Sequence, residues 1–288
     1  MDLAIGEGFM FREMPFEKSL REISKVGFES LELLWGTRYD AKSTDDQIKG
    51  IKKSVDKHGL NVAALLGGGA LASLDAKVRG QAVDTVKRQI EIAQILDCQM
   101  ITAEMSGGNS KQREECIVAF KDSIREILPS LEKADISMSF EPHPGDFIEE
   151  SNMGADVLRS IKSKRIGYLY CCPHTFVLGK DPETMIKYVG DLLNFVHVAD
   201  THKMERIIVS LAPRGFASLA GVPEFEGLKA HEHLTPGHGE VPFDSVFRGL
   251  RKVDFDGIIS CVPFTLDDPV GAARESLKIV KKHLKGKR

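Results

Sequence analysis

The stretch Ile136-Ser-Met-Ser-Phe-Glu141, followed directly by Pro142-His-Pro-Gly145, is the part of this 288-residue chain that indicates its fold most clearly. It reads as a short β-strand, and an amphipathic pattern over Arg113–Lys133, typical of a helix, lies before it. The strand ends on a carboxylate and then on a turn rich in proline. A helix followed by a short strand with a polar end is the repeating unit of a parallel α/β sheet.

The same unit recurs on both sides of this stretch. Other helical patterns lie over Asp84–Leu96, Asp181–Val189, Asp244–Arg251 and Gly271–Leu284. Eight strands are predicted, namely Leu3–Gly8, Ser30–Trp35, Val62–Leu66, Met100–Glu104, Ile136–Glu141, Ile166–Cys171, Phe195–Ala199 and Gly257–Val262. Eight strand–helix units predict one α/β domain over residues 1–288, a closed (β/α)8 TIM barrel, which needs about 250 residues. The alternative is a doubly wound open sheet, but it would be unusual without a glycine-rich phosphate turn after the first strand.

Composition excludes several classes of protein. The net charge of −3 gives no basic surface for nucleic acid or for anionic lipid. The five cysteines are odd in number and irregularly spaced, which argues against a disulfide framework and for a reducing compartment. No apolar run is long enough to span a bilayer, and the first residues do not resemble a signal peptide. We therefore expect a cytoplasmic protein that binds neither nucleic acid nor membrane.

A long irregular stretch, Thr201–Glu240, follows the seventh predicted strand. Loops of this length between a barrel strand and its helix are more often functional or lid-like than accidental, although a disordered surface excursion is the alternative. Within it, Pro236-Gly-His-Gly239 reads as the turn that precedes the next helix, and His238 is expected to belong to that turn rather than to a site.

Seven of the nine histidines lie between positions 143 and 238, mostly where an apolar run ends. Histidine is the commonest metal ligand and the side chain that most easily moves protons near pH 7. In a TIM barrel the reactive groups gather at the carboxyl ends of the strands. The clustering therefore predicts one shared site at that end of the barrel.

Two of the candidates lie at the end of the fifth strand. Glu141 is expected to project into the mouth of the barrel, where a divalent cation or a substrate proton could use it; a solvated loop acid is the alternative. His143 is a candidate catalytic base or a group that orients one, and the equally weighted alternative is that it only caps the turn.

The ends of the sixth and seventh strands supply further candidates. Cys171 and Cys172 are adjacent, so they point to opposite faces and only one can look into the barrel; we interpret both as structural residues. His174, just past the strand, is the stronger candidate ligand. His197 lies near the end of the seventh strand and is interpreted as a ligand, with a buried core histidine as the alternative, and Asp200 lies at the strand exit.

His231 and His233 alternate along an extended segment within the long irregular stretch, so both imidazoles lie on the same side of it. This geometry suits one metal ligand and one proton-transfer group. By itself, two histidines separated by one residue are a weak motif.

Four motifs in order, Ser139-Phe-Glu-Pro-His-Pro-Gly-Asp146, His197-Val-Ala-Asp200, Pro236-Gly-His-Gly-Glu240 and Phe255-Asp-Gly-Ile-Ile259, resemble the xylose isomerase-like barrels of the sugar phosphate isomerase/epimerase and endonuclease IV superfamily. The resemblance covers essentially the whole chain. It implies a TIM barrel with a divalent cation at the mouth, held by Glu, Asp, His and Glu from strands five to eight.

Carried over residue by residue, Glu141 matches the first ligand and His197 the third. Cys171 stands where this pattern has the aspartate, and Val262 stands where it has the final glutamate. The loss of both carboxylates puts epimerisation by two acidic bases in doubt. We therefore predict a rearranged site of Glu141, His174, His197 and His233, which suits Mn²⁺ or Zn²⁺ better than Mg²⁺, with Co²⁺ as a further candidate.

The segment Tyr170-Cys-Cys-Pro-His-Thr-Phe176, together with His231 and His233, is also similar to a branch whose catalytic subunits eliminate aglycones from 3-oxo-glycosides. That similarity implies the possibility of a small partner chain. We expect a homo-oligomer that binds a sugar or sugar derivative.

The predicted function is a metal-dependent sugar isomerase or epimerase that abstracts a proton beside a carbonyl and forms an enediolate, with His143 or His231 as the base and Asp200 as an orienting group. A lyase acting on a 3-oxo-glycoside is one alternative, and a non-catalytic barrel that has lost its metal is another. Phosphodiester hydrolysis in DNA is disfavoured, because Leu66–Gly69 and Glu104–Gly107 stand where that activity requires histidines.

Overall fold

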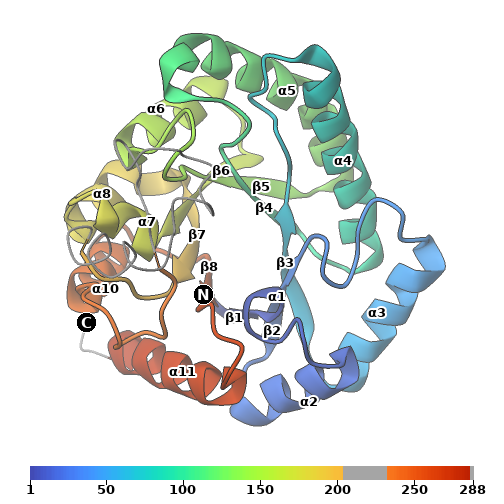
Figure 1. Ribbon diagram of the computed structural model, residues 1–288, viewed down its shortest axis with the longest axis vertical. Coiled ribbons are helices and arrows are strands. Elements are labelled where there is room, and N and C mark those ends of the chain that lie inside the picture. Colours follow the sequence, from blue (N-terminus) through green and yellow to red (C-terminus); the bar gives the residue numbers. More distant parts are fainter. Residues whose placement is uncertain (204–231, 286–288) are drawn as a thin grey trace, which may run out of the picture.

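Eight parallel strands close into one barrel in chain order (Figure 1). The computed structural model describes residues 1–203 and 232–285. The barrel closes where β1 pairs with β8, with Ala4 opposite Ser260. The strands are β1 Asp2–Gly6, β2 Ser30–Leu34, β3 Asn61–Gly67, β4 Met100–Glu104, β5 Ser137–Glu141, β6 Ile166–Cys171, β7 Leu193–Val198 and β8 Ile258–Cys261. The predicted (β/α)8 TIM barrel is confirmed.

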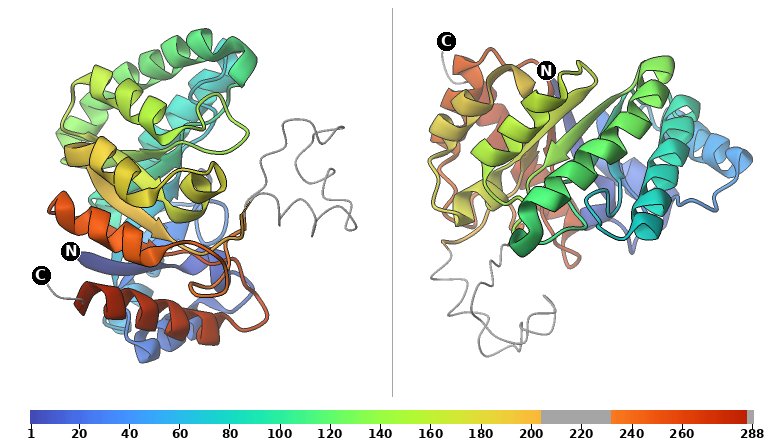
Figure 2. Two further views of the ribbon diagram at one scale, coloured as in Figure 1. Left: turned by 90° about the vertical axis from the view of Figure 1, so that its left-hand side faces the viewer. Right: turned by 90° about the horizontal axis from the view of Figure 1, so that it is seen from above.

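Most of the helices surround this barrel on its outer face, and two short ones, directly after β1 and β6, lie at its mouth (Figure 1). They are α1 Glu7–Met10, α2 Phe16–Val26, α3 Asp45–Lys57, α4 Ala76–Ile95, α5 Arg113–Ala134, α6 Ser151–Ile161, α7 Cys172–Val177, α8 Pro182–Val189, α10 Phe243–Lys252 and α11 Pro269–Lys285, with 3-10 turns η1 Ser110–Gln112 and η2 Gly190–Leu192. Figure 2 shows the N-terminus and the last turn of α11 on the same side of the barrel. No helix within residues 1–203 and 232–285 is long and apolar enough to cross a membrane.

Several predicted boundaries differ from the observed ones, and a polar contact explains two of these differences. The first strand ends at Gly6, not Gly8, because Glu7 begins α1 and its buried carboxylate pairs with Arg38 at 2.7 Å. Helix α4 begins at Ala76, eight residues before the predicted Asp84, because the Asp75 side chain accepts hydrogen bonds from the amides of Lys77 and Val78. An N-cap of this kind starts a helix even where the apolar periodicity is weak.

The strands are buried on both faces, so alternate residues pack into two separate cores. Along β6, Leu169 and Cys171 pack inside the barrel against Phe195 of β7. Tyr170 and Cys172 pack outside it, in the layer between the barrel and its helices. Only one of the two adjacent cysteines therefore faces the interior, as the two-residue period of a strand predicts.

The long irregular stretch after β7 is described at its two ends. Asp200 and Leu234 form an antiparallel bridge, with N···O distances of 2.8 and 2.7 Å. The turn at Pro236-Gly-His-Gly239 precedes α10, as predicted. Residues 204–231, which include the candidate His231, lie outside the described residues.

Candidate active site and metal centre

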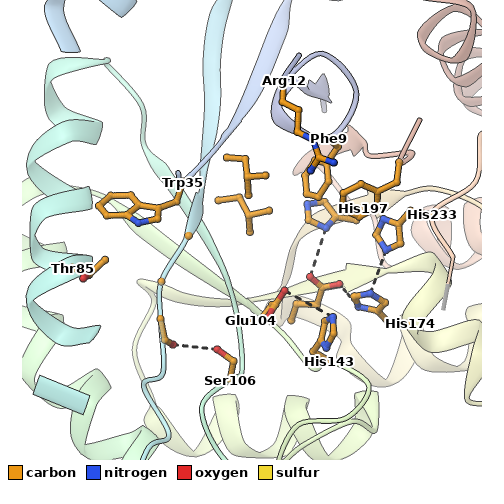
Figure 3. Close-up of a pocket in the computed structure, with 17 residues that line it drawn as sticks. Phe9, Arg12, Trp35, Thr85, Glu104, Ser106, His143, His174, His197 and His233 are labelled. Carbon is orange, nitrogen blue, oxygen red and sulfur yellow. Dashed lines mark hydrogen bonds and ion pairs between the residues drawn. The ribbon is translucent and has the colours of Figure 1, made fainter. Parts of the chain in front are cut away.

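A cavity of about 770 Å³ opens at the carboxyl ends of the strands (Figure 3). Its wall combines titratable side chains with apolar and aromatic ones. The titratable residues are Arg12, Glu104, Glu141, His143, His174, His197 and His233. The position agrees with the general rule that a barrel's site lies at this end of its strands.

The structure brings the four predicted metal ligands together. Glu141 ends β5, His197 lies in β7, His174 lies in the short helix α7 that follows β6, and His233 comes from the segment after residue 231. All four are at most 7% exposed. The Nδ1 atom of His174 lies 2.6 Å from Oε1 of Glu141, the Nδ1 atom of His197 lies 3.7 Å from Oε2 of Glu141, and the Nε2 atoms of His174 and His233 are 3.3 Å apart.

In two of these histidines one ring nitrogen is hydrogen-bonded outside the cluster, so that the other ring nitrogen faces the cluster. His233 donates from Nδ1 to the carbonyl oxygen of Val262 at 3.0 Å, which directs Nε2 inward. His197 donates from Nε2 to Glu32 at 3.0 Å, which directs Nδ1 toward Glu141. Histidines that ligate metals are oriented in this way by an acceptor on the other nitrogen.

The charges of the cluster follow from burial and from the neighbouring groups. Burial alone would lower the pKa of His197, but the carboxylates of Glu32 and Glu141 raise that pKa to about 10. Burial likewise opposes ionisation of Glu141, yet His174 and His197 hold its pKa well below the usual value. In the metal-free protein the His197 imidazolium therefore neutralises buried carboxylate charge, a task that a bound cation would take over.

Cys171 also lies in this cluster. The sequence pattern had favoured a purely structural role for it. Its Sγ atom is 3.8 Å from Nε2 of His233. Two groups of potential ligands have all their donor atoms within 4.8 Å of one another, and they are Cys171 with His174 and His233, and Glu141 with Cys171 and His197. The four predicted ligands are thus divided between two adjoining triads.

This donor set fits a divalent ion. Zinc bonds to nitrogen and sulfur of about 2.0–2.3 Å place the donors of a tetrahedral site roughly 3.3–3.8 Å apart. In the first triad, the separations of 3.3 Å between His174 and His233 and of 3.8 Å between Cys171 and His233 lie in that range, and in the second triad so does the 3.7 Å between His197 and Glu141. Imidazole, thiolate and carboxylate together are ligands of zinc-like ions rather than of magnesium.

His143 and Glu104 face each other beside this cluster. The Nδ1 atom of His143 donates to the carbonyl oxygen of Pro144 at 2.9 Å, and its Nε2 atom lies 3.9 Å from Oε1 of Glu104. The ring packs edge-on against His174, with centroids 4.6 Å apart. Burial raises the pKa of Glu104 against the effect of His143. A carboxyl group with a raised pKa next to an imidazole is a typical acid–base pair.

Asp200 is not among the residues that line the cavity. Its buried carboxylate accepts hydrogen bonds from the backbone amides of Thr201, Gly237 and Val241, at 2.9, 2.8 and 2.9 Å. Among the described residues it therefore orients the backbone of the segment after β7. Its predicted role as an orienting group in catalysis stays a prediction, because the candidate base His231 lies outside the described residues.

Glu32, which the sequence offered only as a residue that could contact substrate or form a salt bridge, has a carboxylate that is fully buried inside the barrel and pairs with His197 at 3.0 Å. Glu32 accepts a hydrogen bond from Thr102 at 2.7 Å in addition to the one from His197. A signal was present, because Glu32 stands in the middle of the apolar strand Ser30-Leu-Glu-Leu-Leu34. A carboxylate in such a strand needs a buried partner.

Another part of the cavity wall is apolar and aromatic, and it adjoins the cluster. Phe9, Trp35 and Phe264 line it together with Leu34 and Leu66. Phe9 and Phe264 pack edge-on with ring centroids 4.8 Å apart, and Phe9 also stacks on His233. The cavity therefore has a polar end that can hold an ion and an apolar side that can hold a ring (Figure 3).

Comparison with known proteins places the chain among proteins of the same architecture. Residues 20–283 match the protein family described as the xylose isomerase-like TIM barrel. The rhizopine catabolism protein MocC of Rhizobium meliloti is 22% identical over 254 residues, which are 85% of this chain and 73% of that protein. D-psicose 3-epimerase of Enterocloster bolteae is 18% identical over 265 residues, 87% of this chain and 77% of that protein.

Solved structures share the fold over nearly the full length. A D-psicose 3-epimerase crystallised in the presence of D-fructose superimposes with a TM-score of 0.78 at 16% identity, covering 99% of this chain and 100% of the other. The IolI protein, solved with a bound zinc atom, gives a TM-score of 0.76 at 15% identity, covering 99% and 98%. The 3-keto-D-glucoside 4-epimerase of E. coli gives 0.74 at 17% identity, covering 98% and 99%.

Proposed function

Because the chain belongs to the xylose isomerase-like TIM barrel family, we propose that it is a metal-dependent enzyme that isomerises or epimerises a sugar by abstracting a proton beside a carbonyl group. The observation that carries the proposal is the pairing of two features in one cavity. One is the buried cluster around Glu141, and the other is the facing pair of His143 and Glu104. Relatives that act as sugar epimerases support the same reaction class.

The proposed ligands are Glu141, His174, His197 and His233, around one divalent ion of the zinc or manganese type. When bound, the ion would supply a Lewis acid that polarises the sugar carbonyl. Glu32 and the carbonyl of Val262 hold the imidazoles of His197 and His233 in place for it. The enclosed position of the cluster excludes bulk water, which strengthens electrostatic interactions there.

His143 is the proposed base. A carbonyl oxygen can only accept a hydrogen bond, so the contact with Pro144 fixes the proton on Nδ1 and leaves Nε2 to take up the substrate proton. Glu104 lies 3.9 Å from that nitrogen, and its raised pKa enables it to hold and return a proton. The carbanion is delocalised as an enediolate. Reprotonation at the adjacent carbon gives an isomer, and reprotonation on the opposite face gives an epimer.

Exchange with solvent deuterium tests this step without knowledge of the preferred product. The zinc-loaded or manganese-loaded protein is incubated in D₂O with D-fructose, D-psicose or a 3-keto-D-glucoside, and proton NMR follows the hydrogen beside the carbonyl. We expect loss of that signal with at least one sugar. The substitution His143→Asn should slow the exchange by roughly 10²–10⁴-fold.

The control is His238→Asn, since His238 is exposed and pairs with Glu275 away from the cavity. It should exchange at the wild-type rate. Metal-loaded protein that exchanges no hydrogen in any of these sugars would contradict the proposal and favour a non-catalytic barrel.

A second candidate function is elimination of an aglycone from a 3-oxo-glycoside, and the aromatic side of the cavity favours it. Phe9, Trp35 and Phe264 offer apolar surface for a leaving group with a ring. Elimination begins with the same proton abstraction but ends with expulsion of the substituent. Release of a chromogenic phenol from a 3-oxo-glycoside would select the lyase, whereas interconversion of free ketoses without release would select the isomerase or epimerase.

A further inference from the structure

Cys171 is the last residue of β6 and points into the barrel. The direction is dictated by the strand, because Leu169 two residues earlier also packs inside, whereas Cys172 packs outside among the helices. Its side chain is 2% exposed and lies beside the histidine cluster, with Sγ 3.8 Å from Nε2 of His233. A thiol in this position has imidazoles and a carboxylate as its neighbours.

Both groups of potential ligands include this thiol. The first joins it to His174 and His233, and the second joins it to Glu141 and His197. Within the described part of the chain, Cys171 is the one residue that these two groups share. An ion in either group, or between them, would therefore lie within reach of the Cys171 sulfur.

We infer that Cys171 is a metal ligand, and that its sulfur makes this site select zinc over manganese and magnesium. The inference rests on the metal-dependent function proposed above. On binding, the thiol loses one proton to solvent and a metal–sulfur bond forms, with no change of oxidation state. The thiolate and the Glu141 carboxylate then carry two negative charges, which equal the charge of the ion. Thiolate is a soft donor that favours zinc, whereas manganese and magnesium favour oxygen.

The wild-type protein provides the first test. Loaded with Co²⁺ in place of zinc, it should show a thiolate-to-cobalt charge-transfer band in the near ultraviolet, and X-ray absorption of the zinc form should show one sulfur at about 2.3 Å. Cys172→Ser is the matched control, because Cys172 is adjacent and equally buried but faces away. The control should keep the band, and Cys171→Ser should lose it.

Competition with a chelator provides the second test. Cys171→Ser should weaken zinc binding by more than the roughly 10–100-fold that follows loss of a group that only orients a ligand. Cys171→Asp, which supplies oxygen in place of sulfur, should lower the ratio of zinc affinity to manganese affinity. Circular dichroism of each variant verifies folding, and the wild-type spectra decide the matter if a variant does not fold.

Cobalt-loaded wild-type protein without the band, or zinc affinity unchanged in Cys171→Ser, would overturn the inference. These outcomes are separate from the fate of the proposed function. A protein that binds zinc through sulfur but exchanges no hydrogen in any sugar would refute the function and leave the ligand assignment intact. A protein that exchanges hydrogen but shows no metal–sulfur bond would do the reverse.

Discussion

Glu32 and His197 form a buried ion pair across the barrel, from strands that are 165 residues apart in sequence. The carboxylate fixes the ring of His197 by accepting from Nε2, and it favours a more basic Nδ1 on the side of the cluster. Thr102 holds the same carboxylate from β4. The orientation of His197 thus depends on a residue that does not itself line the cavity.

The substitution Glu32→Gln removes this charge but keeps the shape of the side chain. We expect zinc affinity to fall by about 10–100-fold, as is typical when a metal-binding histidine loses its orienting carboxylate. Chelator competition measures the change, and Glu29→Gln, an exposed glutamate three residues earlier, is the control. Equal zinc affinity in Glu32→Gln and wild-type protein would show that the pair has only a structural role.

The sequence predicted single residues at the site only where the geometry of one strand determines the direction of a side chain. The two-residue period and the strand ends identified Glu141 and His197, and they showed that just one of Cys171 and Cys172 could face inward. They could not show that Glu32 lies behind His197, because that contact depends on which strands meet around a closed barrel. The sequence did not predict that the Cys171 thiol lies among the potential ligands, because cysteine is also a common core residue.

Asp200 ties together the segment that carries His233. Its carboxylate accepts hydrogen bonds from three backbone amides, and its own backbone pairs with that of Leu234, the neighbour of His233. Space around it is tight, since a Cβ atom on Gly239 would lie 2.4 Å from Oδ1 of Asp200. The whole hydrogen-bonded segment around Asp200 and Leu234, and not one side chain, therefore positions His233 at the cluster.

The substitution Asp200→Ala should leave buried amides without acceptors and destabilise the protein by about 3 kcal/mol. Zinc affinity should fall as well, because His233 loses its support. Urea unfolding and chelator competition measure the two effects, with the exposed Asp244→Ala as the control. If Asp200 instead acted directly on a proton-transfer histidine, Asp200→Asn would lower kcat while the free energy of unfolding stayed constant.

Asp181 begins α8 and connects it to α10. Its side chain accepts from the amide of Thr184 at 2.8 Å and from the hydroxyl of Ser245 at 3.0 Å. Hydrogen bonds from the Thr184 side chain and amide lower the pKa of Asp181. Because the folded pKa lies below the unfolded one, the cap stabilises the protein above the unfolded pKa and loses its effect as the pH falls through the folded pKa.

We expect Asp181→Ala to reduce the free energy of unfolding by about 1 kcal/mol at pH 7, the usual cost of a lost N-cap. The difference from wild-type should shrink below about pH 4, near the unfolded pKa of aspartate. Urea denaturation at a series of pH values measures it, and Asp191→Ala, an exposed residue in η2, serves as the control. A difference that stayed constant down to pH 3 would contradict the role of the ionised cap.

The boundaries of helices and strands could be predicted where the apolar pattern was strong. The prediction failed where a single polar contact set the boundary. The β5 and β6 strands ended where expected, at Glu141 and Cys171. The start of α4 was missed because Asp75, and not periodicity, begins that helix. The end of β1 was missed because the ion pair of Glu7 with Arg38 folds the chain into α1.

At the scale of the whole molecule, eight recurring strand–helix units were enough to predict the closed barrel and the end at which the site lies. The composition of the site was harder to predict, since its donors come from β5, β6, α7, β7 and the segment around His233. Sequence spacing alone cannot tell which of these side chains meet. It did identify histidines at strand exits, because in a parallel barrel all carboxyl ends of strands converge.

An ion held by donors from so many elements would link one half of the barrel, so its removal should lower the stability of the entire domain. A ligand that binds only the folded state adds about 2.7 kcal/mol at a concentration 100 times its Kd, which corresponds to roughly 4–5 °C in Tm for a domain of this size. We therefore expect Tm to fall by that amount after dialysis against a chelator and to return with added zinc. His233→Ala should abolish the response and His238→Ala, whose exposed imidazole pairs with Glu275, should retain it. A Tm that is independent of zinc in the wild-type protein would mean that these donors do not form a metal centre.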